Sequence, residues 1–571
     1  MSLTSALNSA VASLKVNQSA IQVLSANVAH ANDPNYSKKT LIQETLFNGP
    51  DQPGGVVIAG YSNAVDDAMR KQYEALTAKN ATTSTSSDYL SRIQDILGSS
   101  SDTTSFSTLL ATFNTAWQTY QANPDSATAQ QQVVTTGQQF AASINQAATQ
   151  IDHLDTDAKT DTENTVKSLN DLLEQAYNIN VQIKGTQTND AGFGDLIDQR
   201  DAVVRQIAQI VDVRTIQRND GTVTLFTTGG MSLLDGAPRK FAYDGTNVTD
   251  VESGQVINTQ VRDGKLKALL DFRLDNTALN QPPSSDPSVE VIRKLKSQLD
   301  LVAQAFTSTL GSPTTFAAAY NNATASQRVS ATFATSVNAT PSSAQSSTVS
   351  LSGAFQAGDV FAVTVNGKTY SYTAATGDTS LDQIATQLSN KINADATLGV
   401  TAIPGVAGLR LSANNNNVKF DVSTTVNGQL PELTSSFFSG TDRYSFGVNA
   451  SLLDGSQQLK RNASSDVVNA LSDSSRNFVS AGMTVTNTSY KGMVSTLIGT
   501  ASANAKTVGD QSKFNGDTLT MTQQKYQSST GVNLDEEIAN LQVLQNAYAA
   551  SARLLTVIQS LFDTLQQAVS H

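Results

Sequence analysis

The chain of 571 residues contains no cysteine and only three histidines, His30, His153 and His571, which lie far apart in the sequence. Without thiols it has no disulfide, no cysteine-ligated zinc or iron–sulfur centre and no thiol nucleophile. Three scattered histidines are poor material for a histidine-rich metal site or a histidine-dependent catalytic triad. We therefore expect a protein that is not an enzyme, with no catalytic residue, no metal site and no cofactor.

Long apolar runs and basic clusters are also missing. No stretch approaches the roughly 18–20 apolar residues that span a bilayer. The first fourteen residues lack the basic region and continuous apolar core of a cleaved secretory signal. The net charge of −12 argues against nucleic acid, whose phosphates require a basic surface. We expect neither a nucleic acid nor a membrane as a partner, and either a cytoplasmic location or export without a cleaved leader.

Charge is scarce at both ends of the chain, where apolar residues follow a heptad spacing. In the first 32 residues, Lys15 is the only charged residue, and between Ile538 and His571 only Arg553 and Asp563 are charged. Steps of four and three residues separate the members of the first row, Leu3, Leu7, Ala10, Leu14, Asn17, Ile21, Leu24 and Val28. The same steps connect Leu541, Leu544, Tyr548, Ser551, Leu555, Ile558, Phe562, Leu565 and Val569. This spacing predicts a coiled-coil-like helix at each end.

The residues beside these rows are Ser, Ala, Gln and Asn instead of the charged pairs that flank an isolated coiled coil. Small uncharged flanks suit helices that are surrounded by other helices on several sides. We therefore expect the ends to order mainly between neighbouring subunits and to be frayed in a free monomer, because a lone pair buries little area against its backbone entropy. Ordinary packing inside one helical bundle is the alternative.

Inside the ends, the periodicity predicts helices over 65–97, 103–121, 125–156, 158–184 and 193–211, with a returning helix near 486–512. Asn123-Pro124 separates two of them, because Pro fits the first turn of the helix that follows. Trp117, the only tryptophan, lies in one of these amphipathic helices and is expected in its core. Residues 211–275 are predicted to be β-rich, with a turn at Asn219-Asp220-Gly221, and a helical stretch follows at 287–309.

Residues 347–425 have the pattern of a small α+β module. Alternating Phe361, Val363 and Val365 lead into Asn366-Gly367, a strong hairpin signal. A helix is predicted at 379–393, with further strands at 409–411 and 418–422. The expected fold class is α+β and multidomain, a discontinuous helical body from both termini with inserted β-rich domains. The predicted parts are a terminal assembly domain (1–35 and 535–571), a helical bundle (36–210 and 430–534), a β-rich domain (211–310), a linker or irregular loop (311–346) and the inserted module (347–429).

Two groups of charged residues invite other interpretations. The acidic cluster of Asp152, Asp155, Asp157, Asp161 and Glu163 lacks the glycine and the spacing of an EF-hand loop, so a solvated junction between two helices is favoured over a calcium site.

The second group, Asp198, Arg200 and Asp201, is expected to form surface ion pairs on a helix, rather than to supply catalytic acids.

Both ends carry motifs that resemble a known family. Ala26-Asn27-Val28-Ala29-His30-Ala31-Asn32-Asp33-Pro34-Asn35-Tyr36-Ser37 is similar to the amino-terminal motif of bacterial flagellar rod, hook and hook-associated proteins. The segment from Gly531 to Glu537, with Tyr548–Arg553 and Leu561–Leu565, resembles the carboxy-terminal motif of the hook-associated protein 1 family, which forms the hook–filament junction. A third stretch, residues 195–201, also resembles the sequence of this family. The resemblance covers roughly 1–245 and 430–571 and leaves the inserted module outside.

The resemblance implies a structural subunit of the flagellum, exported by the flagellar type III channel and located outside the cell. Its implied partners are further copies of itself in a ring, the hook protein, hook-associated protein 3 and an export chaperone. Another axial flagellar protein of the hook or flagellin type, or a secreted adhesin, remains the alternative. The expected assembly interface comprises Leu3, Leu7, Leu14, Asn17, Ile21, Leu24, Asn27, Val28, Asn32, Pro34, Tyr36, Leu541, Leu544, Tyr548, Leu555, Ile558, Phe562 and Leu565.

Overall fold

The computed structural model describes residues 3–47, 53–99, 102–187, 190, 192–276, 278, 281–308, 315–480 and 482–569. The chain forms two compact units, each discontinuous in sequence. The first unit comprises Met1–Arg92, Leu154–Val291 and Asn504–His571, and the second comprises Ile93–His153 and Ile292–Ala503. Long terminal helices and several small sheets confirm the predicted α+β class. The finer domain boundaries drawn from the sequence stay a prediction.

Helices from both ends of the chain build the first unit. The terminal helices are α1 (Leu3–Ala29) and α13 (Leu534–Val569), and the body contains α2 (Asp67–Leu97), α5 (Phe193–Ile210) and the first-unit parts of α4 (Ala127–Gly185) and α12 (Tyr490–Thr530). These bounds confirm the helices predicted at 65–97 and 193–211. The returning helix predicted at 486–512 is longer than expected, because no proline interrupts the sequence before Thr530.

Helix α4 corrects the prediction of two helices at 125–156 and 158–184. It is one continuous helix of 59 residues. The acidic residues near its middle contain neither proline nor a glycine that would end the helix, so charge alone did not break it. The acidic cluster therefore lies along a helix and not at a junction between two helices.

A β-hairpin follows α1 and was not foreseen in the sequence. Strands β1 (Lys39–Phe47) and β2 (Pro53–Asn63) pair antiparallel, with Lys39 opposite Asn63. The hairpin packs closely against α1, because a Cβ added at Gly55 of β2 would lie 3.4 Å from the Cβ of Ala12 on α1. Helix α1 thus contacts the hairpin as well as α13. Among the described residues, no helix combines the length and apolarity required to cross a membrane.

The β-rich part predicted at 211–275 is confirmed as far as Asp250. Its strands are β3 (Arg214–Gln217), β4 (Val223–Phe226), β5 (Ser232–Asp235), β6 (Ala237–Pro238), β7 (Phe241–Tyr243) and β8 (Val248–Asp250). The first four form one antiparallel sheet and the last two form another. Residues 265–273 are instead helix α6 (Lys265–Arg273). Its buried Leu266 and Leu270 join α4, α5 and the strands in one apolar core.

The second unit contains an aromatic core. Trp117 on α3 (Phe106–Ala122) is fully buried against Phe437, Phe316 on α8 (Phe316–Asn322) and Tyr320, which confirms its expected core position. Phe306 on α7 (Val291–Thr307), the helix predicted at 287–309, packs against the same aromatic core. Shorter elements complete this part: α10 (Ala450–Leu453), α11 (Ala463–Ser472), β16 (Phe438–Ser439) with β17 (Gly447–Val448), and β18 (Arg476–Ser480) with β19 (Met483–Thr488).

The inserted module contains two antiparallel sheets and one helix. The strand orders are β13-β14-β10-β9 and β12-β11-β15. The strands are β9 (Val329–Val337), β10 (Ser346–Gly353), β11 (Val360–Val365), β12 (Lys368–Thr373), β13 (Val400–Gly405), β14 (Gly408–Ala413) and β15 (Val422–Val426), with α9 (Leu381–Asn393) between β12 and β13 in sequence. The Asn366-Gly367 hairpin is confirmed, and both residues have the positive φ that such a turn requires.

Two expectations about this region need correction. The stretch 311–346 was expected to be irregular, yet it contains α8 and β9, and only residues 311–314 of it lie outside the described part. Alternation in the short run at 329–337 was masked by Ser, Thr and Ala, so its strand was missed. A strand predicted at 418–422 begins only at Val422, because residues 418–421 leave the preceding turn without regular strand pairing.

Candidate assembly interface

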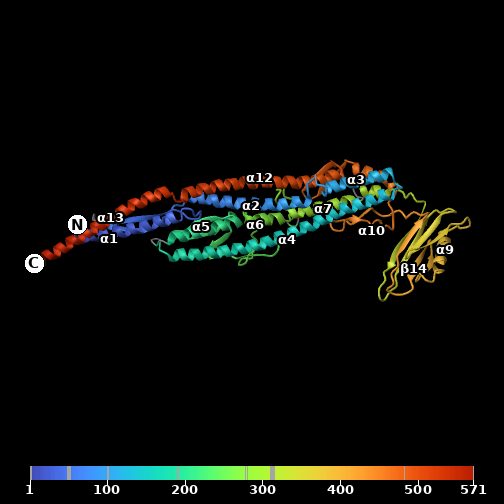
Figure 1. Ribbon diagram of the computed structural model, residues 1–571, viewed down its shortest axis with the longest axis horizontal. Coiled ribbons are helices and arrows are strands. Elements are labelled where there is room, and N and C mark those ends of the chain that lie inside the picture. The colour runs from blue at the N-terminus through green and yellow to red at the C-terminus, as the bar shows by residue number, and fades with distance from the viewer. Residues whose placement is uncertain are drawn as a thin grey trace. The chain divides into compact units, whose positions relative to one another are not determined.

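Helices α1 and α13 lie side by side although they come from opposite ends of the chain (Figure 1). Their small residues allow this close approach. Asn17 was the polar position in the predicted seam, and its Nδ2 lies 3.5 Å from Oγ of Ser551 on α13. The two predicted heptad rows therefore meet within one subunit, and Asn17 has a polar partner at the matching height.

Burial differs among the residues predicted for assembly. Leu24, Asn27, Tyr36 and Ile558 are buried. The partly buried members are Leu3, Leu7, Leu14, Asn17, Ile21, Val28, Leu541, Leu544, Leu555 and Phe562. The exposed members are Asn32, Pro34, Tyr548 and Leu565. The structure therefore brings most of the heptad positions to the α1–α13 contact. Their role between subunits stays a prediction.

Helix α13 also carries large apolar side chains that nothing in the subunit covers. Seven large side chains form this outer row, with exposed fractions from 41% (Leu534) to 65% (Val543). The outer row comprises Leu534, Ile538, Val543, Leu554, Val557, Leu561 and Leu565. Its last four members follow steps of three, four and four residues, so they share one stripe. Of the outer row, the predicted interface contained only Leu565. The spacing of three and four residues between Leu554, Val557, Leu561 and Leu565 was the available signal.

The two terminal motifs meet in a buried polar group that we call the Asn27 cluster: Asn27, Tyr36, Lys38, Lys39 and Glu537. Asn27 donates from Nδ2 to the carbonyl of Lys39 and to Oε2 of Glu537, both at 3.0 Å. Its Oδ1 accepts the Lys39 amide at 3.0 Å and the Tyr36 hydroxyl at 2.9 Å. All four hydrogen-bonding positions of this buried side chain are therefore used.

Ion pairs and rings complete the Asn27 cluster. Lys38 Nζ lies 2.9 Å from the buried carboxylate of Glu537 and 3.1 Å from Glu536. The His30 ring stacks on Tyr36 with the centroids 4.9 Å apart. Burial lowers the pKa of Lys38, but its bonds to the two glutamates outweigh this effect and raise the pKa overall. The cluster thus joins the end of α1, the start of β1 and the start of α13.

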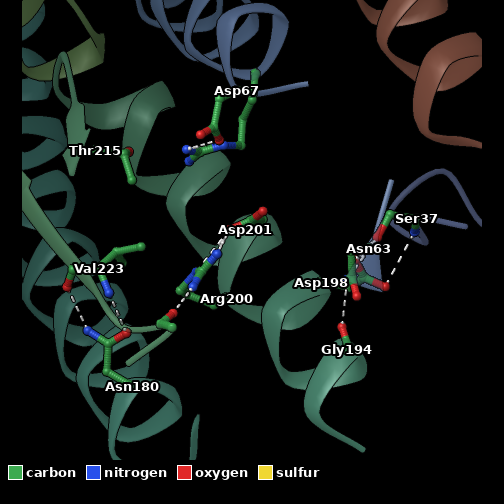
Figure 2. Close-up of polar contacts among 12 residues, drawn as sticks. Ser37, Asn63, Asp67, Asn180, Gly194, Asp198, Arg200, Asp201, Thr215 and Val223 are labelled. Carbon is green, nitrogen blue, oxygen red and sulfur yellow. Dashed lines mark hydrogen bonds and ion pairs between the residues drawn. The ribbon is translucent and has the colours of Figure 1, made fainter. Parts of the chain in front are cut away.

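A second polar layer connects this region to α5. Figure 2 shows Ser37 and Asn63 beside Asp198. Asn63 Nδ2 donates to Asp198 and to the Gly194 carbonyl, both at 3.0 Å, and the Ser37 hydroxyl also donates to Asp198. Burial raises the pKa of the Asp198 carboxyl above its usual value, although the Ser37 hydrogen bonds and Lys39 oppose the rise.

The prediction of surface ion pairs on this helix was wrong. Arg200 is 0% and Asp201 3% exposed, and Asp198 is largely buried as well. Arg200 donates to Asp201 at 2.6 and 2.9 Å and to the Gly221 carbonyl at 2.6 Å (Figure 2). Gly221 has a φ of +80°, and a Cβ there would lie 2.8 Å from the Phe193 ring. These residues tie α5 to the turn before β4, which sequence spacing alone does not reveal.

Another buried pair lies on α2. Arg70 Nη1 lies 3.2 Å from Oε1 of Glu74, and Thr215 on β3 donates to Oε2 of Glu74 at 3.0 Å. Burial raises the pKa of Glu74, and Arg70 opposes that rise. Buried ion pairs of this kind add little net stability, because desolvation offsets the Coulombic gain. They do fix how α2 and β3 pack.

The acidic residues along α4 pair with basic and tyrosine side chains. In the first unit, Arg273 Nε lies 2.6 Å from Asp155, Tyr89 donates to Asp161 at 2.7 Å, and Arg92 also pairs with Asp157. In the described part of the chain, no cluster of three or more acidic or histidine side chains is arranged to hold a metal ion. These carboxylates therefore act as helix-packing partners.

Comparisons with known proteins agree with the motifs at both ends. Residues 90–313 match the model of the flagellar hook-associated protein FlgK helical domain, and residues 523–568 match that of the flagellar basal body rod FlgEFG protein C-terminal region. Flagellar hook-associated protein 1 of Salmonella typhimurium is 25% identical and that of Escherichia coli 26%, each over 99% of both chains.

A solved structure of the flagellar hook junction protein FlgK from Burkholderia pseudomallei aligns with 80% of this chain and 100% of its own. The TM-score is 0.46 at 14% identity, too low to support an argument. The sequence relatives and the matched helical domain give the chain a structural, hook-associated role in the bacterial flagellum, in a family that is not enzymatic. Along its whole length the chain is therefore similar to the FlgK family of flagellar hook-associated proteins, and the likeness includes that family's helical domain.

Proposed function

We propose that the protein is the subunit that joins the hook to the filament, and that it polymerises into a ring through α1 and α13. The outer row of α13 carries this proposal. A helix with one face against α1 and seven further large apolar side chains in water, five of them on one side, is incomplete as a monomer. Full burial of each such side chain contributes roughly 1.5–3 kcal/mol, so helices of neighbouring copies are suitable partners.

The chemistry of the ends supports packing against several neighbours. Charged residues are almost absent from α1 and from α13 beyond Ile538, so these helices carry few groups that would need water or an ion partner. The Asn27 cluster sets the direction in which both helices leave the body of the first unit. A fixed departure direction suits a subunit that must repeat around a ring.

The further partners of the proposal are the hook protein, hook-associated protein 3 and an export chaperone. The location is outside the cell, after flagellar type III export. A secreted adhesin would use the inserted module and would not need the outer row. Hook or flagellin subunits would share self-assembly, but the whole-chain relatives from Salmonella typhimurium and Escherichia coli are hook-associated protein 1.

Replacing Val557 and Leu561 by Gln in cells that lack the wild-type chain tests the proposal. Both side chains are exposed and glutamine favours helix, so the monomer should unfold as the wild type does. We expect hooks without attached filaments and free filament protein in the medium. Val251 and Val406, exposed outside α13, supply the matched control when changed to Gln. Normal filament attachment by the α13 variant would reject assembly through this face.

A further inference from the structure

The first unit carries two more unpaired surfaces, on opposite edges of its body. One is a stripe of exposed side chains on α12 and the other a groove between α4 and α5. Figure 1 shows α12 along one edge and α4 along the other. We propose that the α12 stripe of one copy packs into the α4–α5 groove of the next, forming a lateral contact separate from α1 and α13. This proposal rests on the ring assembly proposed above and adds a second interface to it.

The α12 stripe combines two exposed apolar side chains with two lysines and with Asp517, an exposed carboxylate between them. Phe514 and Met521 are 63% and 61% exposed and seven residues apart, so they lie on the same side of the helix. Lys513 precedes the phenylalanine and Lys525 follows the methionine by one turn, both exposed. With two lysines and one carboxylate beside two large apolar side chains, the stripe is net basic and favours a partly apolar, acidic partner.

The α4–α5 groove has the complementary character. It has a volume of about 420 Å³, and its lining includes Asp171, Glu174, Gln175 and Asn178 of α4 together with Gln199 of α5. Asp171 and Glu174 are exposed. Neither forms an ion pair within the described residues.

The groove also ends next to an exposed apolar side chain. Val181 is 52% exposed and continues the stripe of Asp171, Glu174 and Asn178 at helical spacing. The groove thus offers acidic groups at one end and an apolar group at the other.

The two surfaces also lie at the same height along the unit, measured on α2, which contacts both helices. Asn515 of α12 donates to Thr83 at 3.1 Å, and Tyr89 donates to Asp161 of α4 at 2.7 Å. The Tyr73–Tyr526 ring contact shows that α12 runs antiparallel to α2, and the Arg92–Asp157 pair shows the same for α4. Helices α4 and α12 are therefore parallel.

A rise of about 1.5 Å per residue converts these contacts into heights. Met521 is six residues beyond Asn515, about 9 Å along the axis. Glu174 is thirteen residues beyond Asp161, which is about 20 Å further along α4. Asp161 is level with Tyr89, and Tyr89 is about 9 Å from Thr83 in the opposite direction. Glu174 is thus about 10 Å beyond the level of Asn515, within about 2 Å of Met521.

Matching heights on opposite edges are what a head-to-tail contact requires. Rotation about an axis parallel to these helices places the α12 stripe of one copy against the α4–α5 groove of its neighbour without a change of level. Different patches that meet in this way generate rings or helices, whereas a two-fold dimer would pair one patch with itself. Two lysines would face two carboxylates across the contact.

Disulfide crosslinking tests the contact, because the chain has no cysteine of its own. Cysteines replace Met521 and Gln175 in one full-length chain, expressed in cells that assemble flagella. Oxidation of isolated flagella should convert the monomer band into a ladder of covalent multimers. A second pair, Met521→Cys with Asn178→Cys, allows for an axial offset between copies. The control pair combines Met521→Cys with Thr246→Cys, an exposed position outside the groove, and should give no ladder.

Charge reversal provides a second test with the same readout. Lys513→Glu with Lys525→Glu should reduce the crosslinked fraction severalfold, and adding Asp171→Lys with Glu174→Lys to the same chain should restore it. Filament attachment is scored in parallel and reports the proposed junction function separately. Attached filaments that contain the cysteine pairs but yield no multimers would overturn the lateral contact. A crosslinked fraction that reversal leaves unchanged would overturn the charge pairing.

Discussion

Asn27 of α1 donates a hydrogen bond of 3.0 Å to Glu537 of α13, which joins two residues 510 positions apart in the sequence. The same side chain bonds to the backbone of Lys39 through both its amide nitrogen and its oxygen. One buried amide therefore holds together three segments, α1, β1 and α13. The terminal motifs, which resemble those of other flagellar proteins, therefore hold the two ends of this subunit together.

Replacing Asn27 by Ala should weaken the contact between these three segments. The change leaves the Lys39 backbone and the Glu537 carboxylate short of a partner, and each unmet buried group costs about 1–3 kcal/mol. We expect faster amide hydrogen exchange at the end of α1 and the starts of β1 and α13. Asn32→Ala in the same motif is the control, because Asn32 is exposed. Equal exchange in the two variants would contradict the central position of Asn27.

The end helices should be poorly protected in a dilute monomer. Helix α13 packs against α1 and leaves its outer row in water, while ordering each residue costs about 1–2 kcal/mol of backbone entropy. We expect amides of α13 beyond Glu537 to exchange much faster than those of α2 in the body. Hydrogen exchange with mass spectrometry measures both in one sample. Protection of α1 and α13 equal to that of α2 would show that the pair is stable alone.

Gly137→Ala should destabilise the second unit. A Cβ at this position would lie 2.9 Å from the Phe437 ring and 3.0 Å from that of Phe113, inside the aromatic core. Overpacking of this kind costs roughly 1–3 kcal/mol. Fluorescence of Trp117, which contacts both rings, follows the unfolding in urea. Gly185→Ala on the same helix is the control, because nothing lies within 4 Å of its added Cβ. A urea midpoint that Gly137→Ala leaves unchanged would mean that the aromatic core rearranges without cost and would contradict the prediction.

Acid should weaken the inserted module through Asp395. Hydrogen bonds from Thr397 (2.6 Å), Tyr370 (2.7 Å) and Lys368 (3.1 Å) hold the pKa of this carboxyl far below its usual range. A depressed pKa means that the carboxylate stabilises the fold above the unfolded value of about 4 and that this stabilisation is lost as the pH falls. Burial first, and then the hydrogen bond to Asp395 and its negative charge, raise the pKa of Tyr370 to about 12.

The Asp395→Asn variant tests this pH dependence. At pH 7 its module should exchange amide hydrogens faster than the wild type, and the difference should shrink as the pH falls below about 4. Absorbance titration should also show a Tyr370 that ionises at lower pH in the variant. Asp421→Asn, an exposed carboxylate of the same module, is the control. A difference between Asp395→Asn and wild type that stays constant from pH 7 to pH 2 would contradict the role of the ionised carboxylate.

Local signals predicted many elements correctly. The Asn366-Gly367 turn, the helix α9 that follows it and the apolar periodicity of α2 and α5 depend on residues close together in the sequence. Failures occurred where the signal was non-local or ambiguous. The β1–β2 hairpin packs against α1, which precedes it in the chain. The sequence of β9 resembles a polar linker, and it forms a strand because β10 and β15 lie beside it.

The candidate interface divides in the same way. Heptad spacing and scarce charge at both ends are properties of the sequence alone, and they predicted which faces of α1 and α13 are apolar. Only the tertiary structure decided which apolar row of α13 is covered by α1 and which remains in water. It also placed Asn27 against Glu537 and buried Arg200 and Asp201, which spacing had assigned to the surface. Helical period depends on neighbours in the chain, whereas burial depends on which distant segments arrive beside it.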